Sequence, residues 1–386
     1  MAHISKGISG FVNIINYAGL HINNRLGQRY SVLYVLVFFS VSLFSVSHYI
    51  GIALFNPDSW AYFELAKTVF TDNFYKFNTF RSYFSNEYSA SFPFGYPVLI
   101  ALAHHVVGLS PMVAVGVNIC LAISTVWLIF KIGAVLQLPP ISSFAIASGL
   151  LFFPGYSEEV LGGTAMPLAV LTFLAASYAW ALRYPLIAGV LLGCAALVRF
   201  DYLIYGLLFQ VAVCVVRKKK RSNSSYLFIG FWLGTLPWSI YSYSHFGKLW
   251  ISDNSWVAMS ALPAHVLDFP PAAVVSASDD PLMWITKLLV NFRYLIRAIK
   301  HSIINFPLVI CLSVFVLANW FKIKTVVKLR VAVLFFILLV CMLPYILTGY
   351  MVNRYFSLLW LMTSFILFYA TILIPPGGGI LVGFHL

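Results

Sequence analysis

The sequence predicts an all-α protein, namely a polytopic integral membrane protein of about ten transmembrane helices with juxtamembrane helices in its extracytoplasmic loops. Three observations carry this prediction. Hydrophobic residues make up 61% of the 386 residues and charged residues only 9%, which is too little charge to keep a soluble protein dispersed. Apolar runs of roughly membrane-spanning length recur along the whole chain. The positive charges gather in short segments between these runs, as in membrane proteins.

The first part of the chain is predicted to form one transmembrane module. Residues 1–30 are expected to form a cytoplasmic segment, and residues 31–243 the module itself, with a first outer loop at 55–111. Within this loop, the stretch 96–107 is apolar but short for a span, so we expect a helix along the outer surface. Spans are expected at 31–54, 112–135, 140–155, 166–183, 186–200, 202–216 and 225–243. Those at 140–155 and 186–200 are short, which indicates tilted, broken or internally packed helices.

The second part begins with another outer loop. Residues 244–302 are expected to form this loop, which ends in a juxtamembrane helix whose basic and apolar side chains are typical of a helix at a lipid surface. Residues 303–386 are expected to hold the last transmembrane helices, at 303–321, 330–349 and 355–374, and a short cytoplasmic tail. Both termini are thereby predicted to be cytoplasmic, in a multi-pass plasma-membrane protein.

This topology separates the charges by side. The cytoplasmic segments hold bases and no acid, whereas every acid falls outside: Asp58, Glu64, Asp72, Glu87, Glu158, Glu159, Asp201, Asp253, Asp268, Asp279 and Asp280. The net charge of +13 would indicate nucleic acid in a soluble protein, but here the positive-inside rule accounts for it and no nucleic-acid partner is expected. Because acids contribute little to orientation, their position separately predicts that any carboxylate chemistry is extracytoplasmic.

Asp58 is the first candidate for chemistry. Pro57 ends the first predicted span, and Asp58 lies where a new helix would start. One interpretation is a helix cap, because an aspartate there accepts backbone N–H groups. The other is a general base near the membrane surface, where a carboxylate can take a proton from a lipid-bound hydroxyl.

Five stretches, in order, resemble motifs of the C-type glycosyltransferases. They are Asp58 to Ala66, Phe92 to Pro97, Gly189 to Asp201, Pro237-Trp238 with His245 to Lys248, and Asn353 to Tyr355. They are similar to the first-loop acidic motif, the Pro-rich start of the juxtamembrane helix, a Gly-rich span ending in Arg, a "PW…FG" segment, and an Arg-Tyr opening a late span. The family includes protein O-mannosyltransferases, the aminoarabinose transferase of lipid A and bacterial surface-polysaccharide transferases.

The resemblance implies a reaction. The donor would be a polyprenyl (undecaprenyl) phosphate sugar, the acceptor an extracytoplasmic lipid-linked glycan of the O-antigen or lipopolysaccharide type, and the transferred group a hexose. Asp58 would act as general base, with inversion of the anomeric centre and an extracytoplasmic active site. Besides these substrates, the expected partners are membrane lipids.

The leaving group would be an anionic lipid phosphate, which needs positive partners. Arg81, Arg199, Lys248 and Arg354 are therefore expected to bind the donor phosphate, since guanidinium groups bind phosphate oxygens in pairs. The alternative for Arg199 is an ion pair with Asp201, and for Arg354 a snorkelling anchor at the interface. The residues expected to line the substrate are Tyr62, Glu64, Tyr96 and Trp238.

One position departs from the family pattern. Many members have a second acid before a proline, where this chain has Met166-Pro167. The nearest acids are Glu158 and Glu159, about two helical turns upstream, and either could bind the acceptor or a divalent ion. No metal ligand and no definite cofactor are predicted. Carboxylates of this kind could still bind a divalent cation.

Two other functions stay open. A lipid-linked-oligosaccharide flippase or other transporter would usually carry charges near mid-membrane and inverted repeats, and neither is visible in the sequence. An O-antigen polymerase or ligase would also use arginines in outer loops, but it would not need the motif from Asp58 to Ala66.

Overall fold

The computed structural model describes residues 57–76, 88–216, 221–252, 281–304, 307–319 and 356–372, together with positions 332, 340, 342 and 346. In this part of the chain the secondary structure is helical, and the one β feature is an isolated antiparallel bridge between Lys76 and Tyr88. The prediction of an all-α protein is therefore confirmed for the described residues.

Most of the helices fall where the apolar runs predicted them. In chain order they are α2 (Pro57–Thr68), α3 (Gly95–Val107), α4 (Pro111–Val135), α5 (Pro140–Phe152), α6 (Pro154–Leu161), α7 (Met166–Ala181), α8 (Pro185–Val198), α9 (Asp201–Val216), α10 (Arg221–Phe246), α12 (Pro281–Ile304), α13 (Pro307–Ala318) and α16 (Phe356–Ile372). The span predicted at 31–54 lies outside the described residues, and the span at 330–349 lies almost wholly outside them.

Proline sets many of the helix starts. It is the first residue of α2, α4, α5, α6, α8, α12 and α13. Proline suits this position because its missing N–H would have no partner in the first turn and its fixed φ is already helical. At α4 the preceding Ser110 adds a cap, because its Oγ accepts a hydrogen bond from the N–H of Met112 at 3.3 Å.

Two boundaries differ from the sequence prediction. α6 is a separate short helix that begins inside the span predicted at 140–155 and continues into the connection to the next span. The last residues of α12, Ile303 and Ile304, lie within the span predicted at 303–321, and α13 starts only at Pro307. Proline breaks the helical run in both places, and hydrophobicity alone does not locate such breaks.

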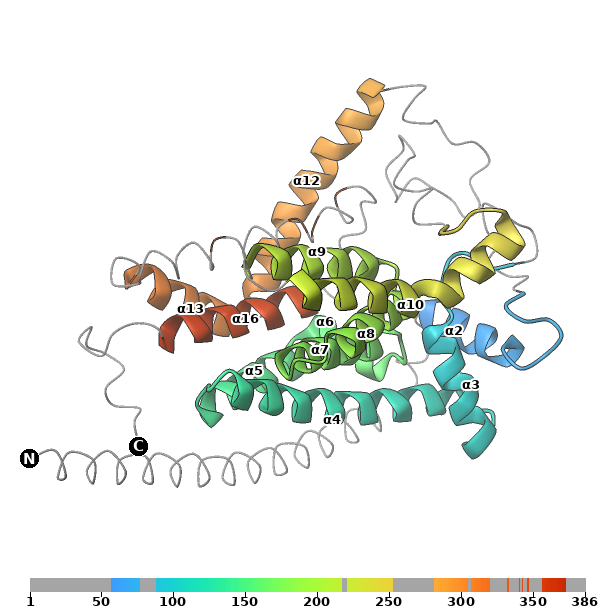
Figure 1. Ribbon diagram of the computed structural model, residues 1–386, viewed down its shortest axis with the longest axis horizontal. Helices are drawn as coiled ribbons and strands as arrows, with labels where there is room; N and C mark the ends of the chain where they lie inside the picture. The colour runs from blue at the N-terminus through green and yellow to red at the C-terminus, as the bar shows by residue number, and fades with distance from the viewer. Residues whose placement is uncertain are drawn as a thin grey trace, which may run out of the picture.

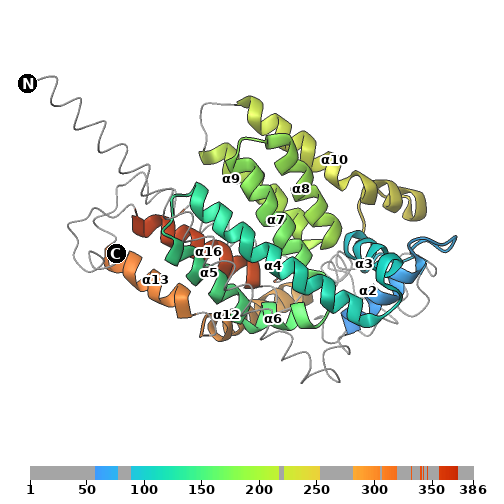
Figure 2. The same ribbon diagram turned by 90° about the horizontal axis from the view of Figure 1, so that it is seen from below.

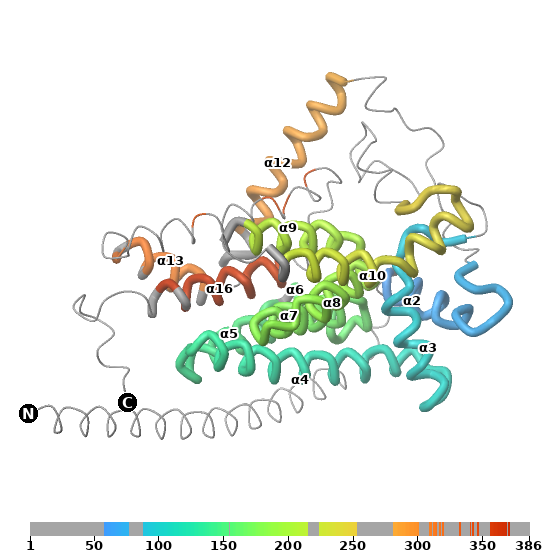
Figure 3. The backbone as a smooth tube through the Cα atoms, viewed as in Figure 1, coloured from blue at the N-terminus to red at the C-terminus, as the bar shows by residue number. Residues whose placement is uncertain are grey.

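The helices form a bundle with α2 and α3 at one end. α4 packs against α5 and α7, α7 packs against α8, and α8 packs against α9 and α10 (Figure 1, Figure 2). α13 lies along α16 on the side of the bundle opposite α2 and α3 (Figure 3). α12 rises from the bundle at an angle, with its Pro281 end farthest out (Figure 1). The ends of α4 and α10 nearest α2 and α3 are Pro111 and Phe246.

The α8–α10 contact, hereafter the glycine seam, is made by glycines on both helices. The four residues are Gly189, Gly193, Gly230 and Gly234, two on each helix and four positions apart. A methyl group on Gly189 would lie 2.1 Å from the carbonyl oxygen of Leu227, and one on Gly193 would lie 2.4 Å from that of Phe231. Because these are backbone atoms, side-chain rotation cannot relieve the clash. Small residues at this spacing are typical of tightly packed transmembrane helices.

One helix in the described ranges is long and apolar enough to cross a membrane by itself, Pro111–Val135 with 25 residues. The pair Gly155–Leu161 and Met166–Ala181 would be a second if it forms one broken span, although its parts are bent by 115°. Pro140–Phe152 has 13 residues, about 20 Å of helix against a hydrocarbon core of about 30 Å. The prediction of about ten transmembrane helices therefore stays a prediction, as do the domain limits.

Candidate functional site

The start of α2, which carries Asp58, contacts the bend that follows the other two predicted acids. Asp58 occupies the first turn of α2, as expected. The hydroxyl of the next residue, Ser59, donates a hydrogen bond to the carbonyl oxygen of Gly162, in the bend between α6 and α7. This bend directly follows Glu158 and Glu159, which lie on α6. The fold therefore brings the start of α2 to the bend that carries both acids, although Ser59 and Gly162 are 103 positions apart.

Asn118 of α4 organises the bend. Its Nδ2 donates to the carbonyl oxygens of Glu159 at 3.1 Å and Thr164 at 2.9 Å. Its Oδ1 accepts a hydrogen bond from the Tyr96 hydroxyl of α3 at 3.0 Å. Asn118 is fully buried, so each bond forms without competition from water. One amide thus joins α3, α4, α6 and the bend before α7.

The two glutamates differ in environment. Glu159 is only 5% exposed, and its Oε2 accepts a hydrogen bond from the Thr164 hydroxyl. Glu158 is exposed on the same helix, and α6 turns away from α7 at the bend. Partial burial and the adjacent Glu159 carboxylate raise the pKa of Glu158 above its usual value. The sequence could not separate the two acids, whereas the structure makes Glu159 part of the bend and leaves Glu158 accessible.

Arg199 and Asp201 form a two-point ion pair between α8 and α9. Arg199 has extended backbone geometry after the end of α8, and Asp201 begins α9. The Nε–Oδ1 distance is 3.1 Å and the Nη2–Oδ2 distance is 3.3 Å, and each side chain is 11% exposed. The ion-pair interpretation of Arg199 is confirmed. The contact of Arg199 with a donor phosphate stays a prediction. In that contact the guanidinium would bind both Asp201 and the phosphate.

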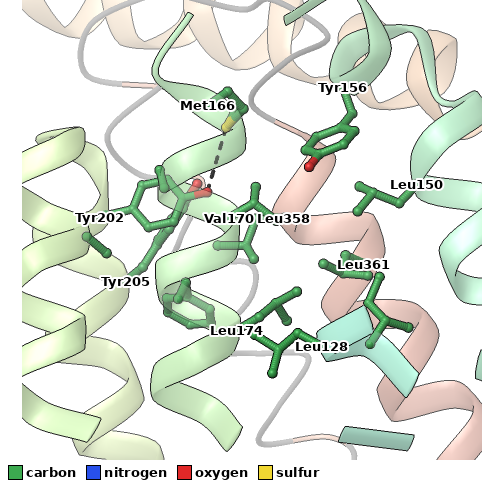
Figure 4. Packing of buried hydrophobic residues seen from close by; sticks show 14 of the residues in the cluster. Leu128, Leu150, Tyr156, Met166, Val170, Leu174, Tyr202, Tyr205, Leu358 and Leu361 are labelled. Atoms are coloured by element: carbon green, nitrogen blue, oxygen red, sulfur yellow. Dashed lines mark hydrogen bonds between the residues drawn. The ribbon is translucent and has the colours of Figure 1, made fainter. Parts of the chain in front are cut away.

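Met166 occupies the position where the resembled family has an acid. The hydroxyl of Tyr202, one residue after Asp201, donates to the Met166 sulfur at 3.7 Å (Figure 4). Tyr156 of α6 lies in the same buried cluster, and its hydroxyl donates to Thr125 Oγ1 at 3.4 Å. A packed tyrosine and a thioether therefore occupy this position. The acids nearest this position are those of α6 and Asp201.

The residues predicted to line the substrate are mostly packed in the interior. Tyr96 and Trp238 are fully buried and Tyr62 is 4% exposed. The Tyr62 ring meets the Tyr96 ring edge to face at 5.1 Å, and Trp238 Nε1 donates to the Ile251 carbonyl at 3.1 Å. In the structure these three residues pack in the interior and thereby position α2, α3 and α10. Their substrate-lining role stays a prediction.

Glu64 is on the more exposed face of α2. It forms an ion pair with Lys67 at 2.6 Å, and the two side chains are 26% and 35% exposed. An exposed pair of this kind contributes little stability, about 0.2–1 kcal/mol. Glu64 is therefore available to solvent in a way that the aromatic lining residues are not.

An aromatic cluster joins α2 to the end of α10. Trp238, Tyr241 and Tyr75 pack with Ala61 and Leu65 of α2. The Tyr241 hydroxyl donates to the Ser89 carbonyl at 2.9 Å, which ties α10 to the segment before α3. The cluster fixes the face of α2 that carries Ala61 and Leu65, so the direction of Asp58 depends on both α10 and the α6–α7 bend.

Basic groups lie next to this cluster. The His245 ring stacks on Tyr88 with centroids 3.9 Å apart, and Lys76 Nζ lies 5.5 Å from the Tyr88 ring centroid. Burial and the nearby Lys76 ammonium lower the pKa of His245. Lys248, a predicted phosphate ligand, is exposed just after Gly247, whose φ of 69° ends α10. These bases therefore lie near the aromatic cluster, against which Tyr88 and Phe246 pack.

Two predicted phosphate ligands, Arg81 and Arg354, lie outside the described residues. In the part of the chain that the structure describes, no group of three or more His, Cys, Asp or Glu side chains is arranged to hold a metal ion. Glu158, Glu159 and Asp58 are therefore not arranged as a ready-made metal site in this structure.

Sequence reasoning missed Asn118, Thr164 and Ser59. A signal existed for Asn118, because an amide within the apolar run 112–135 needs a partner wherever that run is buried. Ser59 and Thr164 gave no comparable signal, since a hydroxyl in a connection is satisfied by water or backbone without a special arrangement.

Comparison with protein-family models, with curated proteins and with solved structures found no match for this chain.

Proposed function

We propose that the chain is a multi-pass membrane glycosyltransferase. It moves a hexose from a polyprenyl phosphate to an extracytoplasmic lipid-linked glycan of the lipopolysaccharide or O-antigen type. The proposal places the α2–α3 end of the bundle outside the bacterial inner membrane and both termini in the cytoplasm. One observation supports it most: the start of α2, with Asp58, is bonded to the α6–α7 bend, so that Asp58, Glu158 and Glu159 occupy one end of an otherwise apolar bundle.

Asp58 is the general base in this proposal. Its carboxylate takes the proton of the acceptor hydroxyl while the hydroxyl oxygen attacks the anomeric carbon of the donor. The bond from that carbon to the phosphate oxygen breaks on the opposite face, which inverts the centre and releases polyprenyl phosphate. The start of a helix is a suitable place for a carboxylate, because the helix dipole there favours the charged form.

The roles of the other acids follow from their surroundings. Glu159 holds the bend, since its carboxylate accepts from Thr164 and its carbonyl from Asn118. Glu158 is exposed and is the better candidate to hydrogen-bond the acceptor sugar. Charge on the released phosphate would be balanced by Arg199, whose guanidinium is held by Asp201, and by Lys248.

Sugar transfer in detergent tests this function. Purified full-length protein is mixed with a panel of radiolabelled polyprenyl-phosphate hexoses and with lipopolysaccharide acceptors, and the label in the acceptor is counted. We expect label transfer together with free polyprenyl phosphate. A flippase gives no transfer in detergent, because transport needs a sealed membrane, and a polymerase lengthens lipid-linked oligosaccharides instead of consuming the monosaccharide donor. Either of these results contradicts the proposal.

A further inference from the structure

A groove opens on the side of the bundle between α4, α7 and α8. Its volume is about 450 Å³, within the range of about 300–1,000 Å³ typical of ligand pockets. The lining is almost entirely apolar and includes Trp127, Leu128, Leu171, Ala175, Leu182 and Leu191. Trp127 is 53% exposed and Leu182 is 42% exposed, so the groove is open to the surroundings of the bundle.

The groove occupies the half of the bundle that lies away from Asp58. Along α7 it runs from Leu171 to Leu182, whereas the Asp58 end is at the start of α7. Eleven helical steps rise about 16 Å, about half the hydrocarbon core of a bilayer. The groove therefore has the depth of one leaflet, which fits a phospholipid acyl chain and is too short for an extended polyprenyl chain.

Two cationic side chains, Lys131 and Arg183, lie at the end of the groove farthest from Asp58. Lys131 is one helical turn from the lining residue Trp127, and its Nζ lies 5.3 Å from the indole centroid. Arg183 is exposed between two lining residues, Leu182 and Tyr184. The ion pairs found among the described residues, at Lys67 and Arg199, involve neither cation. The apolar groove thus ends at positive charge that no described carboxylate neutralises.

Arg183 also has an unusual backbone. Its φ is 68°, the left-handed conformation in which glycine is favoured, and the turn around it is closed by the Tyr184 N–H donating to the Ala179 carbonyl at 2.9 Å. The substitution Arg183→Gly therefore removes the charge while it suits the turn. This makes it an informative variant, because a loss of binding cannot be attributed to a broken α7–α8 connection.

We propose that this groove binds an anionic phospholipid of the cytoplasmic leaflet. One acyl chain lies along Leu171 to Leu182, and the phosphate contacts Lys131 and Arg183. This inference rests on the membrane topology of the proposed function but not on its chemistry, and the site is separate from the Asp58 end. Each cation near an anionic headgroup adds about a fivefold preference, so about 25-fold is expected for the two.

Binding is measured on the purified full-length protein in detergent, with phosphatidylglycerol as the anionic probe and phosphatidylcholine of the same chains as the neutral one. Thermal unfolding over a lipid titration gives the apparent affinity of each. We expect phosphatidylglycerol to bind about 25-fold more tightly than phosphatidylcholine. Glycerol phosphate, which has the headgroup chemistry without acyl chains, should not stabilise the protein, and stabilisation by it would identify a phosphate site instead.

Three variants locate the site. Arg183→Gly and Lys131→Ala should each lower the preference for phosphatidylglycerol about fivefold and leave phosphatidylcholine binding unchanged. Ala175→Leu, which adds side-chain volume inside the groove, should weaken both lipids by tenfold or more. Lys67→Ala, which removes one positive charge far from the groove, should change neither value.

Equal affinity for the two lipids, or a preference that survives loss of both cations, would overturn the inference. So would unchanged binding in Ala175→Leu. Because unfolding and not sugar transfer is followed, a protein that binds phosphatidylglycerol as expected but transfers no sugar contradicts only the proposed function. A protein that transfers sugar without lipid preference contradicts only the lipid site.

Discussion

Two regions hold the helices of this bundle together, and they are built differently. The glycine seam joins α8 and α10 by direct backbone contact, with no polar side chain needed. The α2–α3 end is joined by hydrogen bonds through Asn118, Ser59 and Thr164. The seam consists of backbone atoms in close contact, whereas the polar end holds carboxylate, amide and hydroxyl groups in hydrogen bonds. The proposed chemistry therefore belongs to the end that carries polar groups, whereas the seam supplies close backbone packing.

A large side chain introduced into the glycine seam should cause the largest loss of stability. Gly193→Leu forces a side chain against the Phe231 carbonyl and Gly234, which are backbone atoms, and should lower the free energy of unfolding by about 3 kcal/mol or more. Thermal unfolding in detergent measures this. The matched control is Gly116→Ala on α4, where an added methyl meets no atom within 4 Å, and a gain of up to about 1 kcal/mol is expected. Equal stability of the two variants would contradict the backbone contact.

Substitutions at the polar end should lower stability less than those in the glycine seam, and only where they remove a hydrogen-bond partner between helices. Asn118→Leu keeps a side chain of similar size but removes the amide bonds to the Tyr96 hydroxyl and to the Thr164 and Glu159 carbonyls, of which only the Glu159 carbonyl keeps another donor, Thr164, so we expect a loss of about 2–3 kcal/mol. The control is Ser148→Ala on α5, whose hydroxyl bonds only its own helix at Phe144. It should change stability by less than about 0.5 kcal/mol. A tolerated Asn118→Leu would mean that the amide does not hold the bend.

A buried lysine outside both regions should make the stability of the protein depend on pH. Burial lowers the pKa of Lys287, on α12, from 10.5 to about 8. As pH falls from 10.5 to 8, the unfolded chain takes up this proton before the folded one, so stability decreases through that window and stays lower below pH 8. Lys287→Met should flatten this dependence and add about 1–2 kcal/mol at pH 7. The exposed Lys300→Met is the control, and an unchanged slope in Lys287→Met would contradict the burial of the ammonium.

Much of the fold could be predicted from hydrophobicity. The apolar runs gave α4, α5, α7, α8, α9 and α10 within a few residues, because each buries a long apolar stretch and starts at a proline or after a short polar connection. α6 was missed, because eight residues with two adjacent glutamates carry no apolar period. The Arg199–Asp201 pair could be anticipated since the residues are two apart in the chain.

Long-range contacts could not be predicted. The bond from Ser59 to Gly162 depends on how α2 meets a bend far along the chain, and no local pattern encodes it. The same holds for Asn118, whose sequence signal gives the need for a partner but not its identity. The interior position of Trp238 was also hidden, because an aromatic residue beside a proline fits an exposed stacking surface as well as a core.

The proposed transfer mechanism depends most directly on Asp58. The deciding measurement is sugar transfer by Asp58→Asn and Asp72→Asn, made in the same detergent assay with equal amounts of folded protein. Asp72 is an exposed acid of the same segment, so its substitution controls for the lost charge. We expect Asp58→Asn to lose about 10²–10⁴-fold in transfer rate with its unfolding temperature unchanged, and Asp72→Asn to stay near wild type. Full transfer by Asp58→Asn would contradict the general-base assignment.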